Sequence, residues 1–178
     1  MSNKKFMVDV EAIGDMPGGV ILSIGWVRFR PDLGPDLETA KEVRLDIDLQ
    51  LSQGLKVNSG PINFWLDQKA KPWGPELDEH AAHPVFALDK FNQDMRGASE
   101  VWAKPPTYDL TGIRSCMAAF EMVPSWSFRA ECCLRTLFKT GPQGLRQPPL
   151  ADGTKHGALA DAIHQATDAA AMLKAMRQ

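Results

Sequence analysis

The chain has 178 residues, 44% hydrophobic and 24% charged, a composition that excludes a disordered protein and predicts an ordinary globular one. Its net charge of −2 argues against a protein that grips long duplex DNA, so any nucleic-acid contact should be short, local and helped by metal ions. We expect neither a membrane span nor a secretory signal, because no long apolar run occurs. The three cysteines lack zinc-type spacing, and reduced thiols in a cytoplasmic compartment fit best.

The first third of the chain predicts three strands. Apolar or alternating residues mark Lys5–Glu11, Val20–Phe29 and Val43–Asp48, and a run of turn-forming residues separates the first two. Because the connections are short, we expect these strands to form an antiparallel meander.

The remainder of the chain alternates between helices and strands. Ser59, followed by Gly60 and Pro61, predicts a helix start, and the Gly- and Pro-rich residues 140–155 predict a mobile loop. Three strands followed by this alternation predict a single α/β domain over residues 1–178, with a mixed sheet flanked by helices. The other expected elements are helices at Val85–Arg96, Tyr108–Met122, Cys133–Lys139 and Ala158–Met176, and short strands at Val101–Ala103 and Trp126–Phe128.

An acidic pair, Asp9 and Glu11, interrupts the first predicted strand. Side chains alternate along a strand, so Val8 and Val10 face one way and the two acids face the other, about 6–7 Å apart. Two unpaired negative charges near a core cost several kcal/mol. Hard divalent ions such as Mg²⁺ or Mn²⁺ prefer an all-oxygen environment of this kind. The pair therefore predicts a cation site.

Two further acids lie where helices begin. Asp109 is just before or within the first turn of its helix, and Asp161 is in the first turn of the last one. His156 precedes Asp161 by five residues, a spacing that would put them on different faces of a continuous helix. They converge only if His156 lies in the preceding loop, and Gly157 allows the chain to reverse there.

In order and local spacing, these five residues resemble the DEDDh 3′–5′ exonuclease superfamily, and most of all its small bacterial and phage exoribonuclease-like branch. The resemblance covers residues 6 to about 166 and implies an RNase H-like fold, with three antiparallel strands followed by parallel ones. The supporting segments are Ile21–Gly25, Trp65–Gln68, Trp102 followed by Tyr108-Asp109, Arg135–Leu137 and His156–Ala162.

The resemblance implies phosphodiester hydrolysis at the 3′ end of single-stranded RNA or DNA, with release of nucleoside 5′-monophosphates. Two Mg²⁺ or Mn²⁺ ions, about 3.5–4 Å apart, would activate water and stabilise the charged transition state. Asp9 would bridge the ions, Glu11 and Asp161 would complete one site, and Asp109 would serve the other. His156, with an unperturbed pKa of about 6.5, would take the proton of the attacking water. RNA is slightly preferred over DNA because the branch is ribonuclease-like.

Substrate contacts are less specific in the sequence. The Leu22–Ile24 segment would wedge against a terminal base, or it is simply core. Trp65 would stack on the terminal nucleotide or fill its helix core. The candidate contacts are Leu22, Ser23, Ile24, Trp65, Gln68 and Arg135, the last of these with a phosphate.

Several alternatives stay open at this point. Taken singly, Asp109 and Asp161 are explained as residues that favour a helix start. The chain departs from the family at Lys104–Pro106 and at Leu110, which leaves room for a binding module on an exonuclease fold. A phosphodiesterase for a small molecule is a third alternative. The closing Ala-rich helix is either core or the surface of a homodimer.

Overall fold

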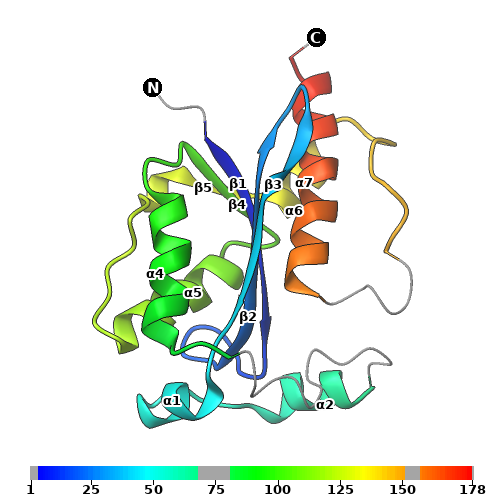
Figure 1. Cartoon of the computed structure of the whole chain (residues 1–178). Helices are drawn as coiled ribbons and strands as arrows, with labels where there is room; N and C mark the ends of the chain where they lie inside the picture. Colours follow the sequence, from blue (N-terminus) through cyan, green and yellow to red (C-terminus); the bar gives the residue numbers. More distant parts are fainter. Residues whose placement is uncertain (1–3, 68–80, 151–156, 178) are drawn as a thin grey trace.

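A computed structural model of the chain describes residues 4–67, 81–150 and 157–177 (Figure 1). Its centre is a five-stranded sheet in the order β3-β2-β1-β4-β5. Among the described helices, none has the length and apolar character to cross a membrane. The strands are β1 (Lys5–Ala12), β2 (Ile21–Arg30), β3 (Gly34–Arg44), β4 (Glu100–Ala103) and β5 (Glu131–Cys133). The α-helices are α1 (Ile47–Ser52), α2 (Ser59–Asp67), α4 (Pro84–Met95), α5 (Asp109–Ala119), α6 (Leu134–Thr140) and α7 (Ala158–Ala175).

The pairing of the strands confirms the predicted mixed sheet. β1 pairs with β2, and β2 with β3, in antiparallel fashion, whereas β1 with β4 and β4 with β5 are parallel. Three antiparallel strands are thus followed by two parallel ones, as the RNase H-like interpretation predicted. β1 lies in the middle of the sheet, so both of its edges are paired.

Two layers of helices enclose the sheet. The helices α4 and α5 lie on one face, and α6 and α7 lie on the other (Figure 1). Alternation along β1 sends Phe6, Val8 and Val10 into the core under α4 and α5, and sends Met7 into the core under α7. Asp9 and Glu11 have the same parity as Met7, so they belong to the face that α7 covers.

The alanines of α7 pack on the sheet. Ala162, Ala166 and Ala169 are fully buried against residues of β1, β2 and α6. The core explanation of this Ala-rich helix therefore holds for these residues, and homodimerisation stays a prediction.

Two predicted strands were wrong. The third strand is Gly34–Arg44, and the expected strand Val43–Asp48 instead runs into α1, because the Asp46 carboxylate accepts the Leu49 N–H at 2.8 Å and caps that helix. The alternation of Val43 to Asp48 therefore marked a strand end and a helix cap. The last strand is Glu131–Cys133, preceded by a short 3₁₀ helix, Phe128–Ala130, and not Trp126–Phe128.

Candidate active site

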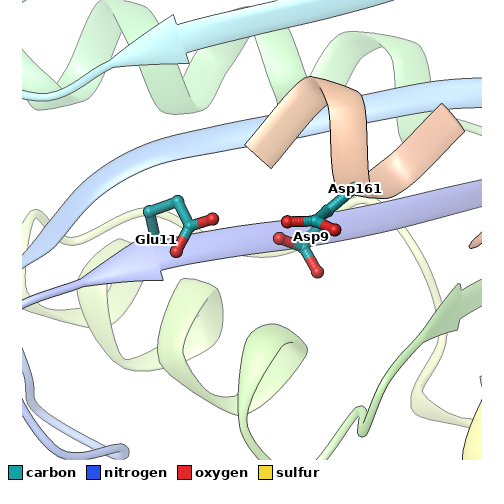
Figure 2. A group of neighbouring side chains, drawn as sticks. All are labelled: Asp9, Glu11 and Asp161. Carbon is teal, nitrogen blue, oxygen red and sulfur yellow. The ribbon is translucent and has the colours of Figure 1, made fainter. Parts of the chain in front are cut away.

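Three carboxylates converge where β1 meets the start of α7. Asp9 and Glu11 come from β1 and Asp161 from the first turn of α7, as Figure 2 shows. One oxygen from each can be chosen so that all three lie within 4.8 Å of one another. The predicted convergence of the acidic pair with the last helix is therefore present in the structure.

Gly25 explains how α7 reaches this position. It pairs with Asp9 across the β1–β2 ladder. A Cβ atom at Gly25 would lie 2.3 Å from the Ala158 carbonyl carbon and 2.3 Å from the Leu159 nitrogen, which no backbone tolerates. Only glycine permits this close approach, which brings Asp161, three residues after Ala158, above Asp9.

Asp109 enters the same pocket from α5. Its side chain is only 3% exposed, and its Oδ2 accepts the Lys104 N–H at 3.2 Å. The pocket has a volume of about 810 Å³, and all four acids line it, Asp9, Glu11, Asp109 and Asp161.

The segment that departs from the family pattern holds Asp109 in place. Besides the Lys104 N–H bond, the Pro105 carbonyl accepts the N–H groups of Tyr108 and Asp109 at 3.0 and 3.2 Å, which orders the start of α5. Leu110 is fully buried in the core under α4 and α5. Both departures are thus compatible with the position of the second-motif acid.

Burial raises the pKa of three acids in the pocket, and neighbouring carboxylates add to the shift for Asp9 and Glu11. Burial, followed by the charges of Asp109, Glu11 and Asp161, raises the pKa of Asp9 well above its ordinary value. Burial and neighbouring carboxylates raise the pKa of Glu11 to about 8. Burial raises the pKa of Asp109 to about 7, although backbone N–H groups and Arg135 oppose the shift. At neutral pH the cluster therefore resists full ionisation.

A divalent cation fits this donor set. Each carboxylate brings hard oxygen ligands, and the chemistry of the set matches Mg²⁺ and Mn²⁺ better than soft metals. A bound cation would also remove the repulsion that raises the pKa values, because it favours the ionised form of every neighbouring carboxylate. The residues present thus suit the predicted ions.

The candidate substrate residues have different positions. Trp65 and Arg135 line the pocket; the Trp65 indole N–H donates to the Ala12 carbonyl at 2.8 Å, and Arg135 is exposed on α6. Leu22, Ser23 and Ile24 are buried in β2 and are not among the described pocket residues, which favours the core explanation of that segment. Gln68 and His156 lie outside the described residues.

Sequence reasoning missed Gln165 and Tyr108, which also line the pocket. The Gln165 amide donates from Nε2 to the Asp9 Oδ1 at 2.7 Å. Gln165 follows Asp161 by four residues on a helix, a spacing that puts both on one face, and this signal could have identified it.

The strand order and the convergence of Asp9, Glu11 and Asp161 agree with the RNase H-like fold and the acidic cluster that the resemblance predicted. The family model of the 3′-5′ exoribonuclease Rv2179c-like domain matches residues 4–173. The chain therefore belongs to this family.

Solved nuclease structures have a similar fold. E. coli exonuclease I in complex with a dT13 oligonucleotide matches with a TM-score of 0.62 and 14% identity, over 98% of this chain and 40% of that one. Cell-death related nuclease 4 matches with a TM-score of 0.61 and 14% identity, over 98% of this chain and 64% of that one. The nuclease domain of 3′hExo, a DEDDh family member bound to rAMP, matches with a TM-score of 0.59 and 12% identity. The match covers 97% of this chain and 92% of that one. The chain thus corresponds to only part of the first two proteins. No curated protein matches the sequence.

Proposed function

We propose that this chain is a metal-dependent 3′–5′ exonuclease that shortens single-stranded ends and releases nucleoside 5′-monophosphates, with RNA preferred over DNA. The observation that carries the proposal is the convergence of Asp9, Glu11 and Asp161 within 4.8 Å, in a pocket that Asp109 shares. Membership of a 3′-5′ exoribonuclease family supports cleavage from the 3′ end and the preference for RNA.

Each acid has an assigned role in this proposal. Asp9 would contact both ions, Glu11 and Asp161 would hold one, and Asp109 would hold the other. Two bound Mg²⁺ or Mn²⁺ ions would supply a reactive water and neutralise charge on the phosphate. His156 would take the proton of that water, because an ordinary imidazole pKa of about 6.5 suits proton transfer at neutral pH.

The lining of the pocket supports a short single-stranded substrate. Phe64 lines the pocket with a partly exposed aromatic ring, and aromatic rings stack on any base. Trp65 is only 1% exposed, which favours its core explanation over stacking on a nucleotide. Lys104 and Arg135 are exposed cations at the same pocket and suit phosphates. Tight binding to long duplexes would need a larger basic surface than a chain of net charge −2 offers.

The test is a time course with 5′-labelled single-stranded RNA and DNA oligomers in Mg²⁺ or Mn²⁺, beside an EDTA control. We expect a ladder that shortens from the 3′ end, faster for RNA, and absent for Asp9→Asn. Asp168→Asn is the control, because Asp168 is a buried acid of α7 that does not line the pocket and whose carboxylate accepts the Gln147 N–H. Intact oligomers with every metal would contradict the proposal, and equal cleavage by Asp9→Asn would contradict the site.

The same assay separates the alternatives. A binding module would bind oligomers without shortening them, and Asp9→Asn would then bind as well as the wild type. Equal rates on a dinucleotide and on longer oligomers would favour a phosphodiesterase for small molecules. The hydrogen bonds that hold Asp109 weigh against a pure binding module, because they position a carboxylate that such a module does not need.

A further inference from the structure

Gln165 contacts the central acid of the cluster from α7. Its side chain is 5% exposed, lines the pocket, and donates from Nε2 to the Asp9 Oδ1 at 2.7 Å. Lying one helical turn after Asp161, it reaches the site from the same face of α7. Few other hydrogen-bond partners are available to an amide that is buried this deeply.

The residue type suits this position. A neutral amide donates to a carboxylate without adding a positive charge, whereas a lysine would compete with a cation for Asp9. The hydrogen bond also restricts the rotation of the Asp9 carboxylate, so that Oδ2 and the remaining lone pair of Oδ1 are presented in one orientation.

The other end of the amide gives a second observation. Within the described part of the chain, the Gln165 Oε1 is buried and has no hydrogen-bond partner. A buried acceptor of this kind calls for a donor. A divalent cation such as Mg²⁺ keeps several of its waters when it binds to carboxylates, and those waters are donors.

We infer that Gln165 is a positioning residue of the metal site, which orients Asp9 through Nε2 and offers Oε1 to the water shell of the bound cation. The inference rests on the proposed function and extends it beyond the five residues of the family motif. It assigns to α7 two contributions to the site, one ligand and one residue that positions another ligand.

The test is calorimetric titration of the full chain with Mn²⁺, for the wild type and Gln165→Met. Methionine has a similar length but neither donates nor accepts comparably, so we expect the Mn²⁺ Kd to rise by about 10–100-fold, the usual cost of losing the partner of a ligand. Exonuclease activity should fall at low Mn²⁺ and recover at saturating Mn²⁺, with the oligomer KM unchanged.

Thr167→Val is the matched control. The substitution removes one side-chain hydrogen bond of α7, from Thr167 Oγ1 to the Ile163 carbonyl at 2.9 Å. Thr167 is not among the residues that line the pocket. Its Mn²⁺ Kd should equal that of the wild type. Gln165→Ala serves as a second variant, because it extends the alanines already present on α7 and cannot overpack the site.

An unchanged Mn²⁺ Kd in either folded Gln165 variant would overturn the inference, even if the melting temperature fell, because a purely structural role changes stability alone. Failure of the wild type itself to bind Mn²⁺ or to shorten oligomers would overturn the proposed function, and the inference with it. The two failures are therefore distinguished by the wild type.

Discussion

The two faces of the sheet differ in what they bury. Under α4 and α5, β1 contributes Phe6, Val8 and Val10 to a core of large side chains that includes Trp26 and Phe91. Under α7, the same strand contributes Met7 and then two acids. The side chains that α7 packs on this face are mostly alanines. One strand thus serves stability on one side and the site on the other, because its side chains alternate. Mutations on the two faces should therefore separate stability from activity.

The largest effect should come from the α7 face. Asp9→Asn should lower exonuclease activity by about 10³-fold or more, because losing a ligand must cost more than the 10–100-fold typical of losing its partner. The melting temperature of the metal-free protein should stay equal or rise, since asparagine stays neutral without the proton that Asp9 must take up when the chain folds. Initial rates and thermal melting in EDTA check this prediction, and a strong drop in melting temperature would contradict it.

The opposite result should follow on the α4 and α5 face. Phe91 packs edge-on against Trp26 and Trp126, with centroid distances of 5.3 and 5.5 Å. Phe91→Ala should lower the free energy of unfolding by about 3–5 kcal/mol, because it leaves a cavity. The activity of each folded molecule should hardly change. Urea unfolding and rates corrected for the folded fraction would measure both quantities. A large loss of kcat would contradict the separation of stability and activity between the two faces.

Gly25→Ala tests the close contact between α7 and β2. The added Cβ would meet the backbone of Ala158 and Leu159, so the start of α7 and Asp161 must move. We expect a loss of about 1–3 kcal/mol in stability together with weaker Mn²⁺ binding. Gly112→Ala in α5 is the control, because the nearest atoms that its Cβ would meet belong to the flexible Met16 side chain and not to the backbone. Calorimetry that finds unchanged Mn²⁺ binding in Gly25→Ala would show that Asp161 tolerates the shift.

The smallest effect concerns pH. The pKa of Glu11 is raised to about 8 and that of Asp109 to about 7, so the folded protein holds protons that the unfolded chain has already released. The contribution of these two acids to metal-free stability should therefore be fully present below about pH 4, where both states are protonated, and should be lost as pH rises to about 8.

A cation should offset this loss. The melting-temperature increase on adding Mg²⁺ or Mn²⁺ should be larger at pH 8 than at pH 6, by about 2–4 °C for each 1 kcal/mol that the two acids lose between these pH values. Thermal melts at the two pH values measure it, and Glu11→Gln should reduce the difference. An equal increase at both pH values would show that the acids are ionised without a metal.

Sequence reasoning identified most of what is local. The acidic pair on β1, the acids that begin α5 and α7, and the antiparallel pairing of the first strands follow from alternation, helix-start residues and connection length. The parallel strands that follow were implied by the family resemblance. Asp46 shows where this fails: its alternating neighbours resembled a strand, but its side chain caps α1. A period of two over six residues does not distinguish a strand from a strand end followed by a cap.

By itself, the sequence determined which residue types the site would contain and on which face of β1 they would lie, because side-chain direction is a property of the local backbone. Only the tertiary structure decided that Gly25 admits α7, that Lys104 and Pro105 hold Asp109, and that Gln165 contacts Asp9. These contacts join residues as much as 156 positions apart, and their distances depend on how closely the helices pack on the sheet. Periodicity along the chain carries no information on that distance.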